Sequence, residues 1–179
     1  LTPAFAGELF GAGQPLDATK YFIILPDAIG HGGTAKPSDG LHAKFPRYNY
    51  EDMVAAQHRL VTEGLGIKHV RLVIGNSMGG MHTWLWGVNH ADFMDALAPM
   101  ASQPTEMASR NWMLRRLITD SIRNDPEWNG GNYTTQPKSA RFASVFFGIA
   151  TNGGTLALQK AAPTRALADK LLDDRLAAP

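Results

Sequence analysis

The chain has 179 residues, of which 44% are hydrophobic and 18% are charged, and its formal net charge is +1. This composition is typical of a soluble globular protein with one sizeable core, and the small net charge argues against nucleic acid or an anionic membrane as a partner. The absence of cysteine excludes disulfides and thiolate metal sites, and no apolar run approaches the roughly 20 residues of a membrane span. The compartment, cytoplasmic or periplasmic, is left open.

The first hundred residues alternate between strand-like and helix-like patterns. Three apolar runs are typical of strands: residues 21–25, 70–74 and 93–98. Asn49, with Asp52 three residues later, predicts the start of a helix that ends near Gly64. A second helix is expected over residues 78–90. This order of elements predicts a parallel sheet covered by helices.

Beyond residue 101 the pattern becomes helical. Helices are predicted over residues 105–124, 138–150 and 155–176, the last with a break at Pro163. Residues 129–132, Asn-Gly-Gly-Asn, predict a turn. A helical block that follows a βαβαβ core is typical of an insertion. We therefore expect a partial α/β core over residues 1–101 and a helical cap over residues 102–179.

The stretch Gly75-Asn76-Ser77-Met78-Gly79 directly follows the second apolar run. It fits G-x-S-x-G, the nucleophile elbow, in which a serine projects from a sharp strand-to-helix turn. Glycines flank the serine because larger side chains would collide with the strand and the helix. We predict that Ser77 is a catalytic nucleophile and that the backbone N–H of Met78 faces the developing oxyanion.

Two other motifs have simpler interpretations. Residues 30–35 match the loose dinucleotide pattern G-x-G-x-x-A, but that pattern needs a helix to open within it, and Pro37 argues against one. We interpret the stretch as a glycine-rich turn, with a nucleotide-binding domain as the weaker alternative. His82 lies on the same predicted helix as Ser77 and is expected to be structural or pocket-lining. No histidines combine with a carboxylate at the spacing of a zinc site.

Three stretches of the sequence together form a recognisable set of motifs. They are Gly30-His31-Gly32, GNSMGGM at residues 75–81 followed by Trp86, and IRNDPEWNGGNY at residues 122–133. Over roughly residues 20–134 the chain resembles the α/β-hydrolase fold, in the homoserine O-acetyltransferase branch. The resemblance implies a serine enzyme that forms an acyl-serine intermediate, with Ser77 as the nucleophile and Met78 as one oxyanion donor.

The resemblance also implies groups that this sequence does not contain. In the family, a second oxyanion donor lies upstream of the position of Leu1, and the triad Asp and His follow the cap, past Pro179. No histidine occurs after His90, and Asp173 and Asp174 fall on a helix-like stretch. We therefore expect the chain to be an internal segment, and the remainder of its polypeptide to supply these groups.

The acceptor of the acyl group is predicted from the first helix of the cap. In the family, an arginine there holds the carboxylate of homoserine. Counted back from Asp125-Pro126, the matching position is Thr119, which is neutral and short. Arg115 or Arg116, about one turn earlier, would substitute only in a shifted register. The candidate substrate-binding residues are Asn76, Thr119, Arg115 and Arg116.

These observations favour an esterase-like acyl hydrolase that acts through Ser77 and needs no cofactor, with water or a weakly polar alcohol as the acceptor. Two alternatives stay open. One is a homoserine O-acetyltransferase-like enzyme with acetyl-CoA as the acyl donor, and the other is a non-catalytic binding protein that keeps the fold. The expected partners are a small ester or acyl substrate and the remainder of the polypeptide, with a homodimer through the cap as a further option.

Purified residues 1–179 should show almost no hydrolysis of a p-nitrophenyl ester. A serine hydroxyl is a weak nucleophile without a base, and loss of the base costs on the order of 10⁶ in turnover in a serine protease. Ser77→Ala should therefore change the release of p-nitrophenolate little. Fast turnover that Ser77→Ala abolishes would reveal a base within the chain, with His31 as the first candidate.

Overall fold

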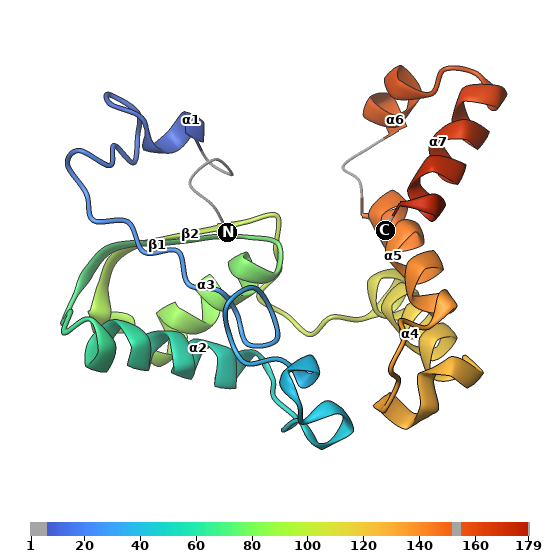
Figure 1. The fold of residues 1–179 in the computed structure, drawn as a ribbon. Coiled ribbons are helices and arrows are strands. Elements are labelled where there is room, and N and C mark those ends of the chain that lie inside the picture. The colour runs from blue at the N-terminus through green and yellow to red at the C-terminus, as the bar shows by residue number, and fades with distance from the viewer. Residues whose placement is uncertain (1–6, 152–154, 179) are drawn as a thin grey trace. The chain divides into compact units, whose positions relative to one another are not determined.

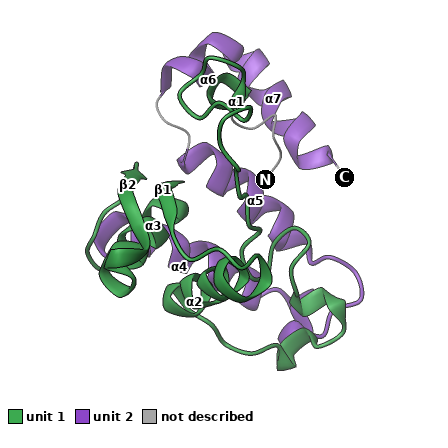
Figure 2. Cartoon of the chain, turned by 90° about the vertical axis from the view of Figure 1, so that its left-hand side faces the viewer, with its two compact units in different colours: residues 1–106 green, residues 107–179 purple. Residues whose placement is uncertain are grey.

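The computed structural model describes residues 7–151 and 155–178. Contacts divide the chain into two compact units, residues 1–106 and residues 107–179, which Figure 2 shows in different colours. The two units are described separately. The function of residues 102–179 as a cap stays a prediction.

Unit 1 is built around two parallel strands. β1 (Val70–Asn76) pairs with β2 (Met94–Met100), with Val70 opposite Met94 and Asn76 opposite Met100. α3 (Met78–Asn89) connects the strands and packs against both of them. α2 (Tyr50–Arg59), extended by the π-helical turn η4 (Leu60–Gly64), packs against α3. Figure 1 shows both helices on the same side of the sheet. The expected parallel pairing is confirmed.

Short helical turns complete the described part of unit 1: α1 (Gly7–Phe10), η2 (Pro37–Asp39), η3 (His42–Lys44) and η5 (Ala91–Phe93). Asp17 stabilises the loop between Gly13 and Thr19. Its carboxylate accepts from the backbone N–H of Gly13 at 2.7 Å and from the hydroxyl of Thr19 at 2.6 Å. The Thr19 hydroxyl, together with backbone N–H groups, holds the pKa of Asp17 below its usual range. This carboxylate therefore serves the local fold.

The strand expected over residues 21–25 is not present, which corrects the prediction. Residues 22–28 carry neither helix nor strand, Phe22 is 78% exposed, and Ile24 packs against the core. An apolar run becomes a strand only where a neighbouring backbone completes its hydrogen bonds. Within the described residues, no ladder bond joins this run to β1 or β2. Apolarity therefore indicated packing at Ile24 but did not determine a strand.

The predicted start of α2 is confirmed. The side chain of Asn49 accepts from the backbone N–H of Asp52 at 3.0 Å, and the Asp52 carboxylate accepts from the N–H of Asn49 at 2.9 Å. This reciprocal cap satisfies two N–H groups that a helix start leaves without partners. At the other end, within the π-helical turn η4, Leu60 is 45% exposed and Val61 is buried.

The core of unit 1 lies where α2, η4, α3 and β2 meet. Its buried cluster consists of Val54, Val61, Trp86 and Met94. Burial of a valine or methionine side chain of this kind typically stabilises a fold by about 1.5–3 kcal/mol. α3 carries the residue after Ser77 at one end and Trp86 near the other, so the packing of Trp86 anchors the helix that follows the candidate nucleophile.

Unit 2 is helical, as expected. Its elements are α4 (Ser109–Arg123), η6 (Pro126–Gly131), α5 (Lys138–Ala150), α6 (Thr155–Ala161) and α7 (Arg165–Ala177). α5 packs against α4 and α7. The predicted turn is confirmed within η6, where Asn129 and Gly130 have φ values of 46° and 62°. Asp125 accepts from the N–H groups of Glu127 and Ser139, both at 2.9 Å, and so ties η6 to the start of α5.

A part-buried polar contact joins α2 and α3. The indole N–H of Trp86 donates to the amide oxygen of Gln57 at 3.1 Å, so the Gln57 amide nitrogen faces Nδ1 of His82 at 3.5 Å. Nδ1 must therefore accept, and the neutral ring carries its proton on Nε2. Burial lowers the pKa of His82. The expected structural function of His82 is consistent with this position, although its role in a pocket stays a prediction.

The free energy of unfolding should fall on acidification because His82 resists protonation in the folded state. Above the unfolded pKa of about 6.5 the ring is neutral in both states, and below it only the unfolded chain takes up the proton readily. The loss continues until the lowered folded pKa is reached, with a slope of at most about 1.4 kcal/mol per pH unit for one histidine. Urea titrations at pH 7.5 and 5.5 give the free energy of unfolding at each pH. The decrease between the two pH values should be smaller for His82→Gln than for wild type. His31→Gln, which changes an exposed ring, should leave the difference unaltered; an equal effect of both variants would contradict the assignment.

Candidate active site

Ser77 occupies a strained turn between strand and helix. β1 ends at Asn76, α3 begins at Met78, and Ser77 between them has φ 54° and ψ −115°. A positive φ is unfavourable for a residue with a Cβ and persists only where the surroundings enforce it. The N–H of Ser77 donates to the carbonyl of Met100 at 3.0 Å, and its own carbonyl accepts from the N–H of Met81 at 3.1 Å. The geometry expected at Ser77 is confirmed, and the side chain is exposed.

Close backbone approach requires glycine at two of the positions around Ser77, and the flanking Gly79 is not one of them, which corrects the expectation that both flanking glycines avoid a collision. A Cβ at Gly75 would overlap the carbonyl group of Gly79 and lie 2.8 Å from the nitrogen of Gly80. A Cβ at Gly80 would lie 2.6 Å from the carbonyl oxygen of Met100. Gly79 differs, because a Cβ there would meet nothing within 4 Å. The turn therefore needs glycine at Gly75 for the crossing of strand and helix, while Gly79 contributes only its backbone.

The backbone N–H of Met78 lies where the predicted oxyanion donor is expected, at the start of α3. As the first residue of α3, its N–H has no acceptor within the helix, and it lies at the positive end of the helix dipole. A negatively charged oxygen formed beside Ser77 would be stabilised at this position. Asn76, the last residue of β1, is exposed next to Ser77. The functions assigned to Met78 and Asn76 stay predictions.

The glycine-rich stretch of residues 30–35 lies in the loop after residues 21–25. No helix opens within residues 30–36. The N–H of Gly33 donates to the Asp27 carboxylate at 2.9 Å, which holds the pKa of Asp27 below its usual range. The hydroxyl of Thr34 donates to the carbonyl of Ala28 at 2.6 Å. The helix required by a dinucleotide pattern is absent at this point, so the geometry is that of a glycine-rich turn.

No histidine hydrogen-bonds to the Ser77 hydroxyl in the part of the chain that the structure describes. The ring of His31 contacts the carbonyl of Ile29 at 3.2 Å. His69 and Asp95 form a pair at 2.8 Å, beside the amino ends of β1 and β2, whereas Ser77 follows the carboxyl end of β1. Sequence reasoning missed this His–carboxylate pair, since only the register of the strands brings the two residues together. Also among the described residues, no group of three His, Cys, Asp or Glu side chains is arranged to hold a metal.

The sequence matches the family described as alpha/beta hydrolase fold over residues 5–144. The chain belongs to this family. It is 36% identical over 155 residues to a homoserine O-acetyltransferase of Chlorobaculum parvum, covering 80% of this chain and 42% of that protein. A homoserine O-succinyltransferase of Magnetococcus marinus is 32% identical over 145 residues, covering 75% and 36%.

Among solved structures, an acetylester hydrolase from Corynebacterium glutamicum aligns with a TM-score of 0.77 and 27% identity, covering 94% of this chain and 52% of that chain. The hydrolase-fold chain thus spans about half the length, or less, of these relatives. No described helix is long and apolar enough to cross a membrane.

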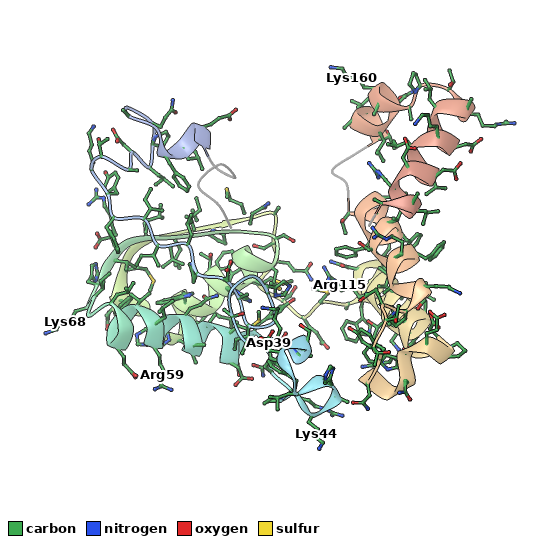
Figure 3. The ribbon with its side chains drawn as sticks, in the orientation of Figure 1. Asp39, Lys44, Arg59, Lys68, Arg115 and Lys160 are labelled. Atoms are coloured by element: carbon green, nitrogen blue, oxygen red, sulfur yellow. The ribbon has the colours of Figure 1, made fainter. Side chains whose placement is uncertain are left out.

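The candidate residues for a substrate carboxylate lie in unit 2 of this hydrolase-fold chain and are engaged within it. The hydroxyl of Thr119 donates to the carbonyl of Arg115 at 2.9 Å. Arg115, labelled in Figure 3, donates through Nε to Asn111 at 3.0 Å, and its guanidinium lies 5.4 Å from the ring centre of Phe147. Nε of Arg116 donates to Asp120 at 2.6 Å. Ser77 belongs to unit 1, so the function of these residues in binding stays a prediction.

Gly75→Ala should destabilise the fold, whereas Gly79→Ala should not. The new methyl at Gly75 collides with backbone, and overpacking of this kind typically costs about 1–3 kcal/mol. At Gly79 the methyl enters open space on a helix, where alanine is favoured over glycine by up to about 1 kcal/mol. Urea unfolding of both variants measures the difference. Equal unfolding free energies would show that the crossing of strand and helix is not as close as the structure has it.

Proposed function

We propose that the protein is a serine-dependent acyl hydrolase of the esterase type that acts through an acyl-Ser77 intermediate. The observation that carries this proposal is the strained, exposed position of Ser77 between β1 and α3. A non-glycine residue held at positive φ beside a helix N-terminus, in a chain of the hydrolase family, is best explained by a requirement for its hydroxyl.

The proposed reaction uses the groups around Ser77 in two steps. The hydroxyl oxygen of Ser77 attacks the ester carbonyl while a base accepts its proton, and the N–H of Met78 stabilises the oxyanion. The bond to the leaving alcohol then breaks, and the alcohol takes up a proton. Water attacks the acyl-serine in the same manner and releases the carboxylic acid. We propose that the base and the acid that orients it come from the remainder of the polypeptide, and that no cofactor takes part.

Hydrolysis is favoured over transfer to homoserine by the chemistry of α4. Thr119 has no charge, and its hydroxyl is already bonded within the helix. Arg115 and Arg116 each donate to a neighbouring side chain. A carboxylate partly removed from water needs a charged partner, and loss of such a partner typically costs about 2–5 kcal/mol. The similarity to an acetylester hydrolase supports the same choice.

Transfer to homoserine is the second candidate, and one specific observation favours it. The relatives of Chlorobaculum parvum and Magnetococcus marinus carry the names of homoserine acyltransferases. In that case Ser77 keeps its function, acetyl-CoA or a related thioester donates the acyl group, and the homoserine hydroxyl replaces water. The two candidates share the acyl-Ser77 intermediate and differ in the acyl donor and the acceptor.

The function of Ser77 is tested with the natural polypeptide that contains this sequence. Hydrolysis of short-chain p-nitrophenyl esters should fall by on the order of 10⁴–10⁶ in Ser77→Ala, and a fluorophosphonate probe should label wild type but not the variant. Ser121→Ala, which removes an exposed hydroxyl of α4, is the matched control and should keep full activity. Hydrolysis that is unchanged in Ser77→Ala would contradict the assignment of Ser77, and no hydrolysis and no labelling in wild type would favour the non-catalytic alternative.

The acceptor is tested by acyl transfer from acetyl-CoA to L-homoserine, measured beside ester hydrolysis in the same preparation. We expect slow transfer without preference for homoserine over simple alcohols. Thr119→Arg should raise the selectivity for homoserine if that position faces the acceptor. Efficient transfer specific for homoserine, with negligible ester hydrolysis, would overturn the proposal in favour of the transferase.

A further inference from the structure

Ser77 has a second strained residue next to it in space. Five non-glycine residues of the described chain have a positive φ: His42, Ser77, Ala101, Ser109 and Asn129. Ala101, with φ 45°, directly follows Met100, whose carbonyl accepts the N–H of Ser77 at 3.0 Å. The two strained residues therefore lie at the carboxyl ends of neighbouring strands and are joined through one hydrogen bond.

The turn at Ala101 brings the chain back against the first turn of α3. A Cβ on Gly80 would lie 2.5 Å from the hydroxyl oxygen of Ser102, 2.8 Å from its Cβ and 2.6 Å from the carbonyl oxygen of Met100. Met100 and Ser102 thus both pack on the backbone of Gly80. A residue at Ala101 with an ordinary negative φ would send the chain in another direction and remove this contact.

The position of Ser102 is imposed by the backbone. Its hydroxyl oxygen is buried and has no hydrogen-bond partner among the described residues. Burial of a hydroxyl without a hydrogen-bond partner is unfavourable. The bonding of the Ser102 side chain therefore does not explain its position, which leaves the direction of the chain at Ala101 to account for the packing of Ser102 on Gly80.

We propose that Ala101 is a positioning residue for Ser77. Its left-handed conformation turns the chain after β2 so that Ser102 packs against Gly80, beside the Met100 carbonyl that accepts the N–H of Ser77. The N-terminal turn of α3 is thereby held between β1 and the end of β2. Ala101 acts on Ser77 only through the packing of Ser102 on Gly80. The inference rests on the proposed catalytic function of Ser77.

The test compares two glycine variants that relieve the same backbone strain. Glycine adopts positive and negative φ with similar ease, so Ala101→Gly frees the turn beside Ser77. Ser109→Gly, at φ 54° in unit 2, is the matched control. Amide hydrogen exchange of Ser77 measures the hydrogen bond to Met100 directly. We expect exchange at Ser77 to become about tenfold faster in Ala101→Gly, with no loss of melting temperature, and to stay within about twofold of wild type in Ser109→Gly.

The variant Ser102→Ala distinguishes an effect of the turn at Ala101 from an effect of the Ser102 hydroxyl. It keeps the Cβ against Gly80, so exchange at Ser77 should stay as in wild type. Equal acceleration in Ser102→Ala and Ala101→Gly would overturn the assignment to Ala101. Unchanged exchange in Ala101→Gly would overturn it too, as would acceleration spread evenly over α3 with a lowered melting temperature, because the residue would then be structural only.

In the natural polypeptide, Ala101→Gly should slow fluorophosphonate labelling of Ser77 and lower kcat about tenfold at unchanged KM. A loss of hydrolysis in Ser77→Ala, together with unaltered exchange and labelling in Ala101→Gly, would leave the proposed function intact and refute the positioning residue. Faster exchange in Ala101→Gly with full hydrolysis in Ser77→Ala would refute the proposed function while supporting control of the turn by Ala101.

Discussion

The approach of two backbone segments at Gly75 and Gly79 sets the geometry on which the candidate site depends. A strand that runs directly into a helix must cross the first turn of that helix at close range, and here the crossing leaves no space for a Cβ at Gly75. The residue at the top of the crossing, Ser77, then has to adopt a positive φ. The strain at Ser77 is therefore a consequence of how β1 and α3 are joined, and it presents the hydroxyl at the end of the strand.

Parallel pairing with β2 completes the arrangement. The carboxyl ends of parallel strands lie at the same edge of a sheet, where ligands bind in open α/β folds. In this chain the ladder continues past Asn76, because the N–H of Ser77 donates to Met100. The buried packing of Trp86 against α2 holds α3 from its other end. The position of Ser77 is thus over-determined by the strand, the ladder and the core beneath α3.

In the part of the chain that the structure describes, Ser77 lies beside an N–H group at a helix start, but no histidine is bonded to its hydroxyl. The N–H of Met78 has no acceptor within α3, because every helix start leaves such groups unpaired. Three histidines are engaged in contacts away from the Ser77 hydroxyl. His82 lies in the contact between α2 and α3, and the rings of His58 and His90 stack with their centres 3.9 Å apart. The proposed acyl-serine chemistry therefore requires a proton acceptor other than these histidines.

Local chemistry in the sequence determined the start of α2 at Asn49, the helical character of residues 109–151 and 155–177, and the turn at Ser77. Each depends on contacts between residues a few positions apart: a reciprocal cap, a helical period, a glycine where two segments cross. The tertiary structure alone decided that residues 21–25 form no strand in the described chain, since ladder bonds come from a neighbour that apolarity does not specify. It also decided the pairing of His69 with Asp95 and the closure of Ser102 over Gly80, because strand register and the direction of the chain after β2 bring these distant residues together.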